Sequence, residues 1–498
     1  MRWIVERPAL DRDFRRQLLW FFGISLLFHL ITAVFSVGFY SWDEHFQTFE
    51  FLSPRLGRGS ISALPWEYAQ AARPWLQPLL YYGVIRFLRE LGVQNAAVWS
   101  AAIRVLSGLA SWSALLLLCI CSFRWFSSVT SRRAVLAMAA LLCFLPFLDV
   151  RTSSENLSAA AFFIGLASYL LIEKPGRRVL VAGLLMGLSI QFRYQSAFMV
   201  LGFMAFLAFS EKKGRELLGL VAMIALVSCA GILIDSWGYG HWCFVPWNYF
   251  RVNLIEGKAN AFSRDPIWFY FARYPELVPP FGALCFLGVI AGWIRRPRHV
   301  LTWVTLPAFV VSSLITHKET RFLFPLVPAV PFLVGFALES ISQARLRHAW
   351  RTLRWVLVPA NSLLLIVLAV KPAYSPFLLY GFIGSNPGIH RIMYRDENPF
   401  VQIRALQTNF YKPPGLALEQ VPTYSGLNAE LSRDGRFWLF EGDSSLPPEA
   451  GALRQHCQLR FSAFPIWLNA LASTPLAPIL RLPGIRFANR RSLFFCSL

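Results

Sequence analysis

Residues 18–40 read LLWFFGISLLFHLITAVFSVGFY, and this apolar stretch decides the class of fold. It is longer than the apolar core of a signal peptide, and no obvious cleavage site follows it. Basic residues precede it, namely Arg2, Arg7, Arg12, Arg15 and Arg16. We therefore interpret the stretch as a retained first membrane span and expect an integral membrane protein.

The composition of the whole chain points the same way. Hydrophobic residues make up 56% of the 498 residues, charged residues make up only 15%, and the mean hydropathy is +0.47. These values lie far from those of soluble globular domains. The net charge of +21 would suit nucleic acid, but the basic residues are scattered between apolar runs. We therefore expect no nucleic-acid partner.

Further apolar segments follow along the chain, and together they predict about eleven transmembrane helices. The segments are 18–40, 96–123, 134–149, 157–172, 179–191, 196–209, 216–234, 278–294, 299–315, 323–339 and 355–370. Several are short for a span of roughly 20 residues, so a tilted or re-entrant helix is an alternative there. Residues 75–91 predict an amphipathic helix on the membrane surface.

The basic residues also predict an orientation, because lysine and arginine favour cytoplasmic loops. The basic loops lie on alternate sides of successive spans, hence on one face, which we assign to the cytoplasm. They are the N-terminus, Arg124/Arg132/Arg133, Lys174/Arg177/Arg178, Lys212/Lys213/Arg215, Arg295/Arg296/Arg298 and Arg345/Arg347/Arg351/Arg354. The other face receives loops 41–95, 150–156, 192–195, 235–277 and 316–322 and the residues after 371.

The composition changes after Lys371 to proline, glycine and mixed polar residues. We therefore expect two domains, a membrane domain over 1–371 and a small mixed non-cytoplasmic domain over 372–498. Short alternating runs at 435–440 and 459–464 predict strands in the second domain.

The eight cysteines have no metal-ligand spacing, and most lie inside apolar runs. Only Cys457 and Cys496 lie in the polar C-terminal part, where they either form a disulfide or remain free.

The first motif that could carry chemistry follows the first span and contains Asp43 and Glu44. A carboxylate at a membrane boundary is partly desolvated, which raises its basicity and suits it to accept a proton from a hydroxyl. The alternative is a helix start, with Asp43 as cap and Glu44 in the first turn. The local sequence favours neither interpretation.

Two aromatic motifs on the same face suit a carbohydrate ligand. One contains Trp66, Glu67 and Arg73. The other runs from Asp235 to Gly240 and continues through Asn248 and Tyr249 to Asp265 and Tyr270. Aromatic rings stack on sugars, while polar groups hydrogen-bond their hydroxyls. The alternatives are an interfacial aromatic belt for the first motif and a structural loop for the second.

Cationic groups also lie in outer loops, against the charge rule. Arg151 and Arg193 each need a fixed partner, which is either an internal carboxylate such as Glu155 or an anionic ligand. His317, Lys318 and Arg321 precede a proline-rich span, where they suit a lipid phosphate, and snorkelling at a helix start is the alternative.

Signatures of nucleotide-binding enzymes are missing from the sequence. It contains neither G-x-G-x-x-G nor a Walker A loop. An Asp-x-Asp occurs only at Asp11 to Asp13, which we interpret as a solvated helix start on the cytoplasmic face.

Taken in order, the motifs resemble glycosyltransferase family 22, which includes the GPI mannosyltransferases and the later dolichol-pathway mannosyltransferases. The matching stretches cover roughly residues 1–335 and are Asp43-Glu44-His45-Phe46-Gln47, Trp66-Glu67-Tyr68 with Arg73, Asp235-Ser236-Trp237-Gly238-Tyr239-Gly240 with Asn248, and His317-Lys318-Glu319-Thr320-Arg321-Phe322. The chain departs from the family in having Pro74 after Arg73, where a serine is common. It also has Gly238 where the GPI branch usually has a bulky aromatic residue, so the subfamily stays open.

The resemblance implies an α-helical polytopic membrane protein of GT-C type. Such an enzyme takes mannose from a polyprenyl (dolichyl) phosphate-mannose donor and transfers it with inversion to a glycan or glycolipid acceptor. It implies Asp43 as the catalytic carboxylate, with Glu44 in support. From their charge we infer that donor-phosphate binding falls to His317, Lys318, Arg321 and Arg193. Sugar or acceptor contacts fall to Gln47, Trp66, Glu67, Arg73, Asp235, Trp237, Tyr239 and Asn248.

This scheme needs no metal and no cofactor, because side chains supply the cations. Its partners are membrane lipid, the lipid-linked donor and the acceptor. The expected location is the endoplasmic reticulum membrane in a eukaryote or the inner membrane in a bacterium, with the active site on the lumenal or periplasmic face. The alternatives are a transporter or flippase of a lipid-linked anionic glycan, and a membrane scaffold whose outer domain binds a partner.

Overall fold

The structure is a computed structural model that describes residues 10–341, 343–402, 406–463 and 491–498. The chain forms two compact units, and we describe each by itself. The helical unit consists of Met1–Ser36, Glu67–Leu80 and Ile103–Lys371. The mixed unit consists of Val37–Trp66, Tyr81–Ala102 and Pro372–Leu498, so it combines the C-terminal residues with two earlier segments.

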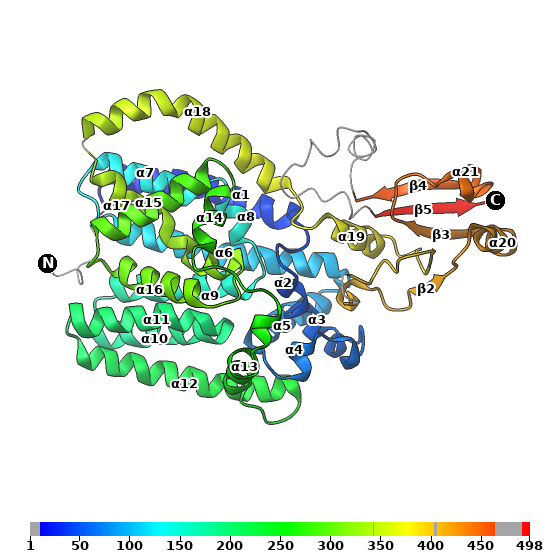
Figure 1. Ribbon diagram of the computed structural model, residues 1–498, viewed down its shortest axis with the longest axis horizontal. Coiled ribbons are helices and arrows are strands. Elements are labelled where there is room, and N and C mark those ends of the chain that lie inside the picture. Colours follow the sequence, from blue (N-terminus) through cyan, green and yellow to red (C-terminus); the bar gives the residue numbers. More distant parts are fainter. Residues whose placement is uncertain (1–9, 342, 403–405, 464–490) are drawn as a thin grey trace. The chain divides into compact units, whose positions relative to one another are not determined.

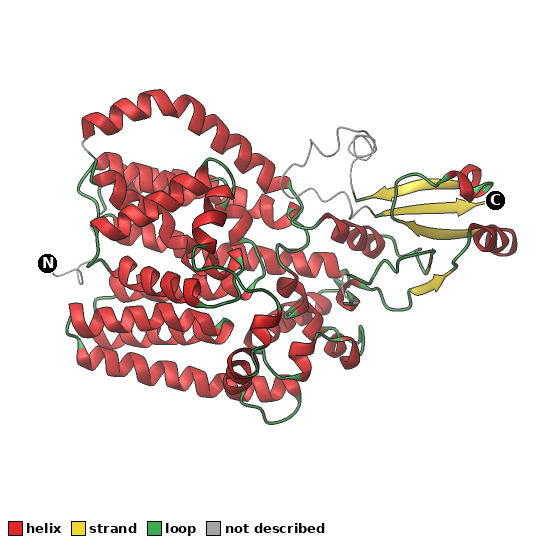
Figure 2. Ribbon diagram, in the orientation of Figure 1, coloured by secondary structure: helices red, strands yellow, loops and turns green. Residues whose placement is uncertain are grey.

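Every segment predicted to span the membrane contains helix (Figures 1 and 2). The helices are α1 (Arg12–Phe35), α6 (Ala96–Ser122), α7 (Val129–Leu141), α8 (Leu145–Asp149), α9 (Ser154–Leu171), α10 (Pro175–Phe192), α11 (Ala197–Ala205), η4 (Phe206–Ser210), α12 (Gly214–Tyr239), α15 (Phe281–Arg295), α16 (Val300–Leu314), η7 (Thr320–Ala329), α17 (Val330–Glu339) and α18 (Gln343–Val370). The amphipathic segment forms α5 (Leu76–Glu90).

Among the described residues, five helices are long and apolar enough to cross a membrane. They are Arg12–Phe35, Ala96–Ser122, Gly214–Tyr239, Thr320–Glu339 and Arg351–Ser385. Shorter apolar helices occupy Tyr194–Ser210, Phe281–Arg295 and Val300–Leu314. The other predicted segments are therefore helical, but their helices are shorter or less apolar than these five.

Local chemistry sets the helix ends. The side chain of Asp11 accepts a hydrogen bond from the backbone of Phe14 at 2.6 Å, so the Asp-x-Asp is a helix start, as predicted. Ser153 caps α9 by accepting from the backbone of Asn156 at 3.3 Å. Helix α12 ends at Tyr239, and Gly240 caps it with a φ of 77°, a backbone conformation that favours glycine.

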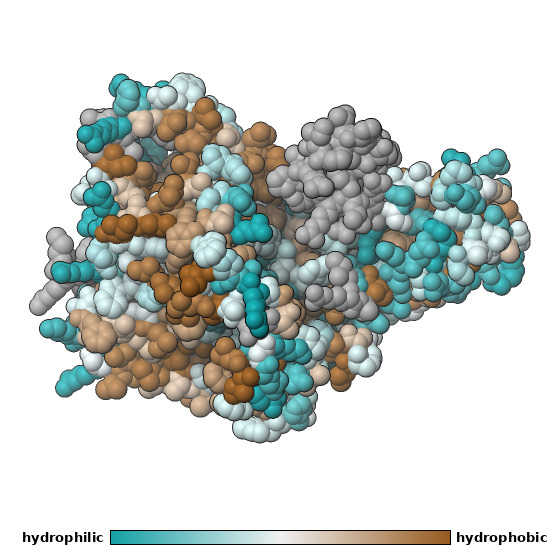
Figure 3. Space-filling view, viewed as in Figure 1, coloured by the Kyte–Doolittle hydropathy of each residue, from teal (hydrophilic) through white to brown (hydrophobic). Residues whose placement is uncertain are grey.

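The helical unit buries aromatic and aliphatic side chains between helices, and α10 packs against both α9 and α12. In the most apolar 18-residue stretch of α12, only 17% is buried inside the protein. The corresponding stretch of Thr320–Glu339 is 61% buried. Apolar side chains thus cover much of the face of the helical unit that Figure 3 shows. A helix with such an exposed apolar face lies against lipid rather than water.

The mixed unit contains a five-stranded sheet of order β2-β1-β3-β5-β4. Its strands are β1 (Arg391–Tyr394), β2 (Ala417–Gln420), β3 (Arg436–Glu441), β4 (Cys457–Ser462) and β5 (Ser492–Ser497). Both runs predicted as strands are strands, β3 and β4, although Phe464 lies outside the described residues. Cys457 and Cys496 are direct partners on β4 and β5 and form a disulfide, which decides the alternative that the sequence left open.

The N-terminal part of the mixed unit is built from short helices, α2 (Trp42–Phe46), α3 (Phe49–Leu52) and the first residue of α4 (Trp66–Ala69). The backbone of Tyr374 donates to the carbonyl of Val37 at 3.0 Å. The backbone of Phe410 donates to the carboxylate of Glu50 at 3.1 Å. These bonds explain why residues 37–66 belong with the C-terminal residues.

Candidate functional site

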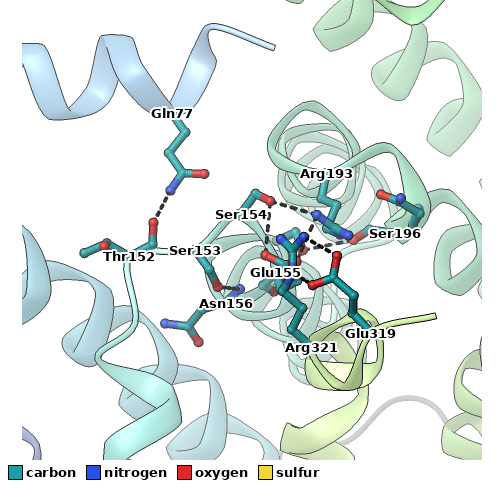
Figure 4. Close-up of polar contacts among 12 residues, drawn as sticks. Gln77, Thr152, Ser153, Ser154, Glu155, Asn156, Arg193, Ser196, Glu319 and Arg321 are labelled. Carbon is teal, nitrogen blue, oxygen red and sulfur yellow. Dashed lines mark hydrogen bonds and ion pairs between the residues drawn. The ribbon is translucent and has the colours of Figure 1, made fainter. Parts of the chain in front are cut away.

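The centre of the site in the helical unit is the carboxylate of Glu155, which binds two arginines (Figure 4). Its Oε1 lies 3.0 Å from Nη1 of Arg193 and 3.1 Å from Nη1 of Arg321. Glu155 lies in the first turn of α9, Arg193 directly follows α10, and Arg321 lies in η7. All three side chains are buried. Three segments that are distant in sequence thus meet at one buried charge cluster.

The cluster also contains Glu319, which forms a two-point ion pair with Arg321. The distances are 2.7 Å from Nε to Oε2 and 3.0 Å from Nη2 to Oε1. Desolvation would raise the pKa of Glu319, but hydrogen bonds from His317 and Arg321 outweigh it and lower that pKa. We call Glu155, Arg193, Glu319 and Arg321 the carboxylate–arginine site.

Arg193 retains an unused donor within this site. Its Nη1 donates to Ser154 at 3.1 Å, whereas its buried Nε has no hydrogen-bond partner among the described residues. Burial lowers the pKa of Arg193, yet an arginine side chain stays charged in a protein. A buried N–H without a partner is rare and indicates a place where a ligand or water can bind.

The loop before α9 is fixed by the side chain of Asn156. Its Nδ2 donates to the carbonyls of Asp149 at 2.5 Å and Arg151 at 2.9 Å. The expected fixed partners of the outer arginines exist, but they differ. Arg193 binds the carboxylate of Glu155, whereas Arg151 donates to the carbonyls of Phe147 and Ser36 at 3.1 and 2.8 Å.

His317 and Lys318 contact the loop that follows α12, and His317 also contacts Glu319 of the carboxylate–arginine site. Nδ1 of His317 lies 2.6 Å from the hydroxyl of Ser263, and Nε2 lies 3.2 Å from Glu319. Nζ of Lys318 donates to the carbonyl of Asp265 at 2.9 Å, and its backbone donates to the Asp265 carboxylate at 3.1 Å. Both residues thus attach residues 263–265 to the segment that carries Arg321.

Parts of the two aromatic motifs form one cluster within the helical unit. The buried carboxylate of Asp235 accepts from the backbone of Trp75 at 2.7 Å. The hydroxyl of Tyr239 donates to the carbonyl of Arg73 at 2.7 Å, and Nδ2 of Asn248 donates to the carbonyl of Ala71 at 3.4 Å. We call these contacting segments, residues 71–75 and 235–248, the aromatic cluster.

Gly238 is required by this packing. A Cβ at Gly238 would lie 2.1 Å from Cγ of Trp75, a side chain that is itself fully buried. The indole of Trp75 thus occupies the space where a side chain at position 238 would lie. The indole of Trp237 is 44% exposed and remains accessible to a ligand.

Tyr249 and Gln195 connect the aromatic cluster to the carboxylate–arginine site. The guanidinium carbon of Arg73 lies 5.6 Å from the ring centroid of Tyr249, whose hydroxyl accepts from Gln195 at 2.5 Å. Gln195 follows Arg193 by two residues. From the sequence, Tyr249 and Gln195 lie in the candidate motifs but receive no role of their own, and Glu155 is a candidate only as a partner of an arginine. The signal in the sequence that could have identified Tyr249 and Gln195 was an aromatic and an amide side chain in predicted outer loops.

The remaining site candidates occupy several positions. Glu67 is buried in the helical unit, whereas Asp43, Glu44, Gln47 and Trp66 belong to the mixed unit. Asp43 is half-buried in the first turn of α2. The carboxylate of Glu44 accepts from the backbone of Tyr40 at 2.9 Å, and the backbone of Gln47 donates to the carbonyl of Asp43 at 3.1 Å. Glu44 therefore helps to start the helix that presents Asp43.

Within the described ranges, no group of three or more His, Cys, Asp or Glu side chains is arranged to hold a metal ion. The cationic groups near the site are arginine, lysine and histidine side chains.

Apolar helices that carry buried ion pairs at one end define an integral membrane protein with a polar site at a membrane boundary. The chain belongs to the Alg9-like mannosyltransferase family, whose sequence profile matches residues 20–399.

Individual relatives agree with the family assignment. The chain is 29% identical over 361 residues to GPI mannosyltransferase 3 of Yarrowia lipolytica, covering 68% of this chain and 64% of that protein. It is 23% identical over 380 residues to GPI alpha-1,2-mannosyltransferase 3 of Danio rerio, covering 70% of this chain and 66% of that protein. The matches thus span slightly less than two thirds of these relatives.

A comparison with solved structures finds ArnT from Cupriavidus metallidurans bound to undecaprenyl phosphate. The two chains are 12% identical, with a TM-score of 0.48 and coverage of 96% of this chain and 97% of that chain.

Proposed function

We propose that the protein transfers mannose from a polyprenyl-phosphate-mannose donor to a hydroxyl group of a glycan or glycolipid, inverting the anomeric configuration, on the non-cytoplasmic face of the membrane. Membership of the Alg9-like mannosyltransferase family supports the reaction type. The observation that carries the proposal is the buried pair Arg193 and Arg321, in which Nε of Arg193 has no hydrogen-bond partner among the residues that the structure describes.

The carboxylate–arginine site is suited to a phosphate. Guanidinium groups bind phosphate oxygens in a two-point geometry, and burial strengthens the interaction. Glu155 and Glu319 keep the arginines in place and balance their charge before the donor binds. When the bond between the mannose carbon and the phosphate oxygen breaks, the electron pair stays on the phosphate. Arg193 and Arg321 would stabilise that added negative charge.

Asp43 is the proposed general base. Its carboxylate would accept the proton of the acceptor hydroxyl while the hydroxyl oxygen attacks the anomeric carbon from the side opposite the phosphate. Such an attack inverts the configuration and leaves mannosylated acceptor, lipid phosphate and a protonated Asp43. Glu44 supports Asp43 through the start of α2.

The candidate sugar-binding residues would stack on the sugar, position the segment 71–75, or hydrogen-bond the sugar hydroxyls. Trp66 is half-buried and Trp237 is exposed, so their rings are the candidates for stacking on a sugar. Asp235, Tyr239 and Asn248 already bind the backbone of residues 71–75 and would position that segment. Gln47, Glu67 and Arg73 remain candidates for hydrogen bonds with hydroxyls.

A lumenal or periplasmic location is part of the proposal. The disulfide between Cys457 and Cys496 supports it, because disulfides persist in oxidising compartments. The compartment would be the endoplasmic reticulum in a eukaryote and the periplasm in a bacterium. No metal or cofactor is needed, since the charged groups of the proposed steps are side chains.

A flippase of a lipid-linked glycan is the second candidate, and one observation favours it. His29 and Asp149 form a buried pair at 2.9 Å inside the helical unit, where ionisable groups often serve transport. A transport path needs several such groups, and the polar contacts described above concentrate instead in the loops at one end of α9, α10 and α12.

The deciding experiment uses purified protein in proteoliposomes with radiolabelled polyprenyl-phosphate-mannose and a glycolipid acceptor. We expect labelled product from the wild type, and about 10²-fold less from Arg193→Met, since a buried donor group is lost. Arg133→Met is the matched control, because Arg133 is exposed and lies outside the site. Movement of labelled lipid across the bilayer without any glycosidic product would overturn the proposal in favour of the flippase.

A further inference from the structure

The loop that follows α12 carries an unusual number of exposed apolar side chains. It includes α13 (Val245–Phe250), η5 (Arg251–Ile255), η6 (Lys258–Ala261) and the start of α14 (Phe269–Glu276). Ten large apolar side chains between residues 241 and 271 are exposed by 45% to 73%. They are Trp242, Phe244, Trp247, Phe250, Leu254, Ile255, Phe262, Ile267, Trp268 and Phe271. We call residues 241–271 the interfacial loop, and Figure 3 shows apolar side chains in the region of α13.

The inner side of the same loop is polar and firmly attached. Ser263 contacts His317 at 2.6 Å, and the backbone of Asp265 donates to the carbonyl of Thr316 at 2.9 Å. Tyr249 binds Gln195 at 2.5 Å. The loop is therefore two-sided, with Tyr249, Ser263 and Asp265 bound to the protein and its apolar groups turned outward.

A lipid bilayer is the surface that fits this apolar side. The loop directly follows α12 in the chain, a helix long and apolar enough to cross a membrane, on which Leu226 and Leu233 are 62% and 64% exposed. Tryptophan concentrates at the boundary between headgroups and acyl chains, and three of the ten exposed side chains are tryptophans. An apolar patch of this size in water would be a liability for a folded protein.

The charges of the interfacial loop and of the rest of α14 favour a neutral lipid surface. Residues 241–276 contain four cationic side chains, Arg251, Lys258, Arg264 and Arg273, and three anionic ones, Glu256, Asp265 and Glu276. Arg251 pairs with Glu256 at 3.3 Å, and Arg273 pairs with Glu276 at 3.5 Å. Nearly balanced charge gives little attraction to anionic lipid, so apolar burial is the main source of binding.

We infer that the interfacial loop docks on the bilayer, with Trp242, Trp247 and Trp268 in the boundary between headgroups and acyl chains. Because Asp265 binds both the backbone and the side chain of Lys318, docking also fixes the segment that carries Arg321 at the membrane surface. The proposed docking does not depend on which sugar or acceptor the protein uses.

Spin labels test the docking in nanodiscs of zwitterionic phospholipid. Cys229 is exposed on α12 and provides a reference inside the membrane, while the other free cysteines of the described chain are buried or half-buried. With Cys229 replaced by serine, single labels are placed at Trp247→Cys, Trp268→Cys and, as the matched polar control of the same loop, Arg264→Cys. Collision rates with oxygen and with a water-soluble nickel chelate then report the depth of each label.

We expect the labels at 247 and 268 to collide with the nickel chelate several-fold less than the label at 264. We also expect them to lie at a shallower depth in the membrane than a label on Cys229 of the protein that retains this cysteine. Nickel collisions equal to those at 264 would show a water-exposed loop and overturn the inference. Low collision rates with both reagents, or dipolar coupling between two labelled copies, would show a protein cover and also overturn it.

Tryptophan quenching by lipids with brominated acyl chains provides a second test without cysteine variants. Trp268→Phe should lower the quenched fraction of the fluorescence. Trp125→Phe is the matched control, since Trp125 is buried in the helical core and its removal should not lower that fraction. An equal effect of both substitutions would contradict the docking of Trp268.

Discussion

The position of a Cβ on Gly238 lies 2.1 Å from Cγ of Trp75, so these two residues exclude any side chain at position 238. The contact joins two segments that are far apart in sequence, and the backbone of Trp75 is also bound by Asp235 at 2.7 Å. Gly238 is therefore matched to a tryptophan that fills the space beside it. The pair gives a structural reason for a glycine at this position of the motif.

Gly238→Ala should destabilise the protein, because the buried indole of Trp75 has no room to retreat. Overpacking of this kind lowers the free energy of unfolding by about 1–3 kcal/mol. Thermal unfolding in detergent measures the effect. Gly23→Ala is the matched control in α1, where a Cβ meets no atom within 4 Å, and it should not destabilise. Equal stability of Gly238→Ala and the wild type would contradict the packing.

Glu155→Gln should destabilise the helical unit, since it leaves Arg193 and Arg321 buried with less negative charge beside them. Breaking a buried ion pair in this way costs about 3–5 kcal/mol. The double variant Glu155→Gln/Arg193→Gln should recover part of the loss, because one buried positive charge is removed as well. A double-mutant cycle by thermal unfolding measures the coupling, and strictly additive effects would contradict a direct interaction.

Glu319 should make stability depend on pH in the acid range. The pKa of Glu319 is lowered in the folded protein relative to its ordinary value of 4.5. Its contribution is therefore fully present above about pH 4.5 and is lost as the pH falls through the lower, folded-state pKa. Unfolding temperatures measured from pH 7 downward should fall less steeply for Glu319→Gln than for the wild type. Parallel curves would show that Glu319 does not carry this dependence.

Cys457→Ser should weaken the mixed unit, because the disulfide joins β4 to β5 across 39 residues of chain. Loss of a native disulfide lowers the free energy of unfolding by about 2–5 kcal/mol. Limited proteolysis should cleave the variant faster within the C-terminal residues. Cys119→Ser is the control, as Cys119 is a buried free cysteine of the helical unit and its replacement should not expose those residues. Resistance of both variants equal to the wild type would contradict a stabilising disulfide.

Much of the helical architecture could be predicted from the sequence, because span length and apolar composition are local properties. All segments selected as spans contain helix, and the described parts of the runs at 435–440 and 459–464 overlap β3 and β4. The predicted ends of the helices were less accurate than their positions along the chain. The first span was predicted to reach Tyr40, but α1 ends at Phe35.

The pairings within the site could not be predicted, because they join residues that are distant in the chain. Glu155 and Arg321 are 166 residues apart, and Trp75 and Asp235 are 160 apart. Nothing in either segment alone specifies the partner. The charge rule did indicate that Arg151 and Arg193 have fixed partners, but it could not distinguish a carboxylate from the backbone carbonyls that bind Arg151.

The central claim, mannose transfer with Asp43 as general base, is tested most directly by single-turnover kinetics. Purified protein is loaded with radiolabelled polyprenyl-phosphate-mannose, and the label reaching the acceptor is followed for the wild type and Asp43→Asn. We predict that Asp43→Asn keeps its unfolding temperature and its donor affinity but forms product about 10²–10⁴-fold more slowly, because the proton acceptor is lost. Product formation by Asp43→Asn at the wild-type rate would contradict the account.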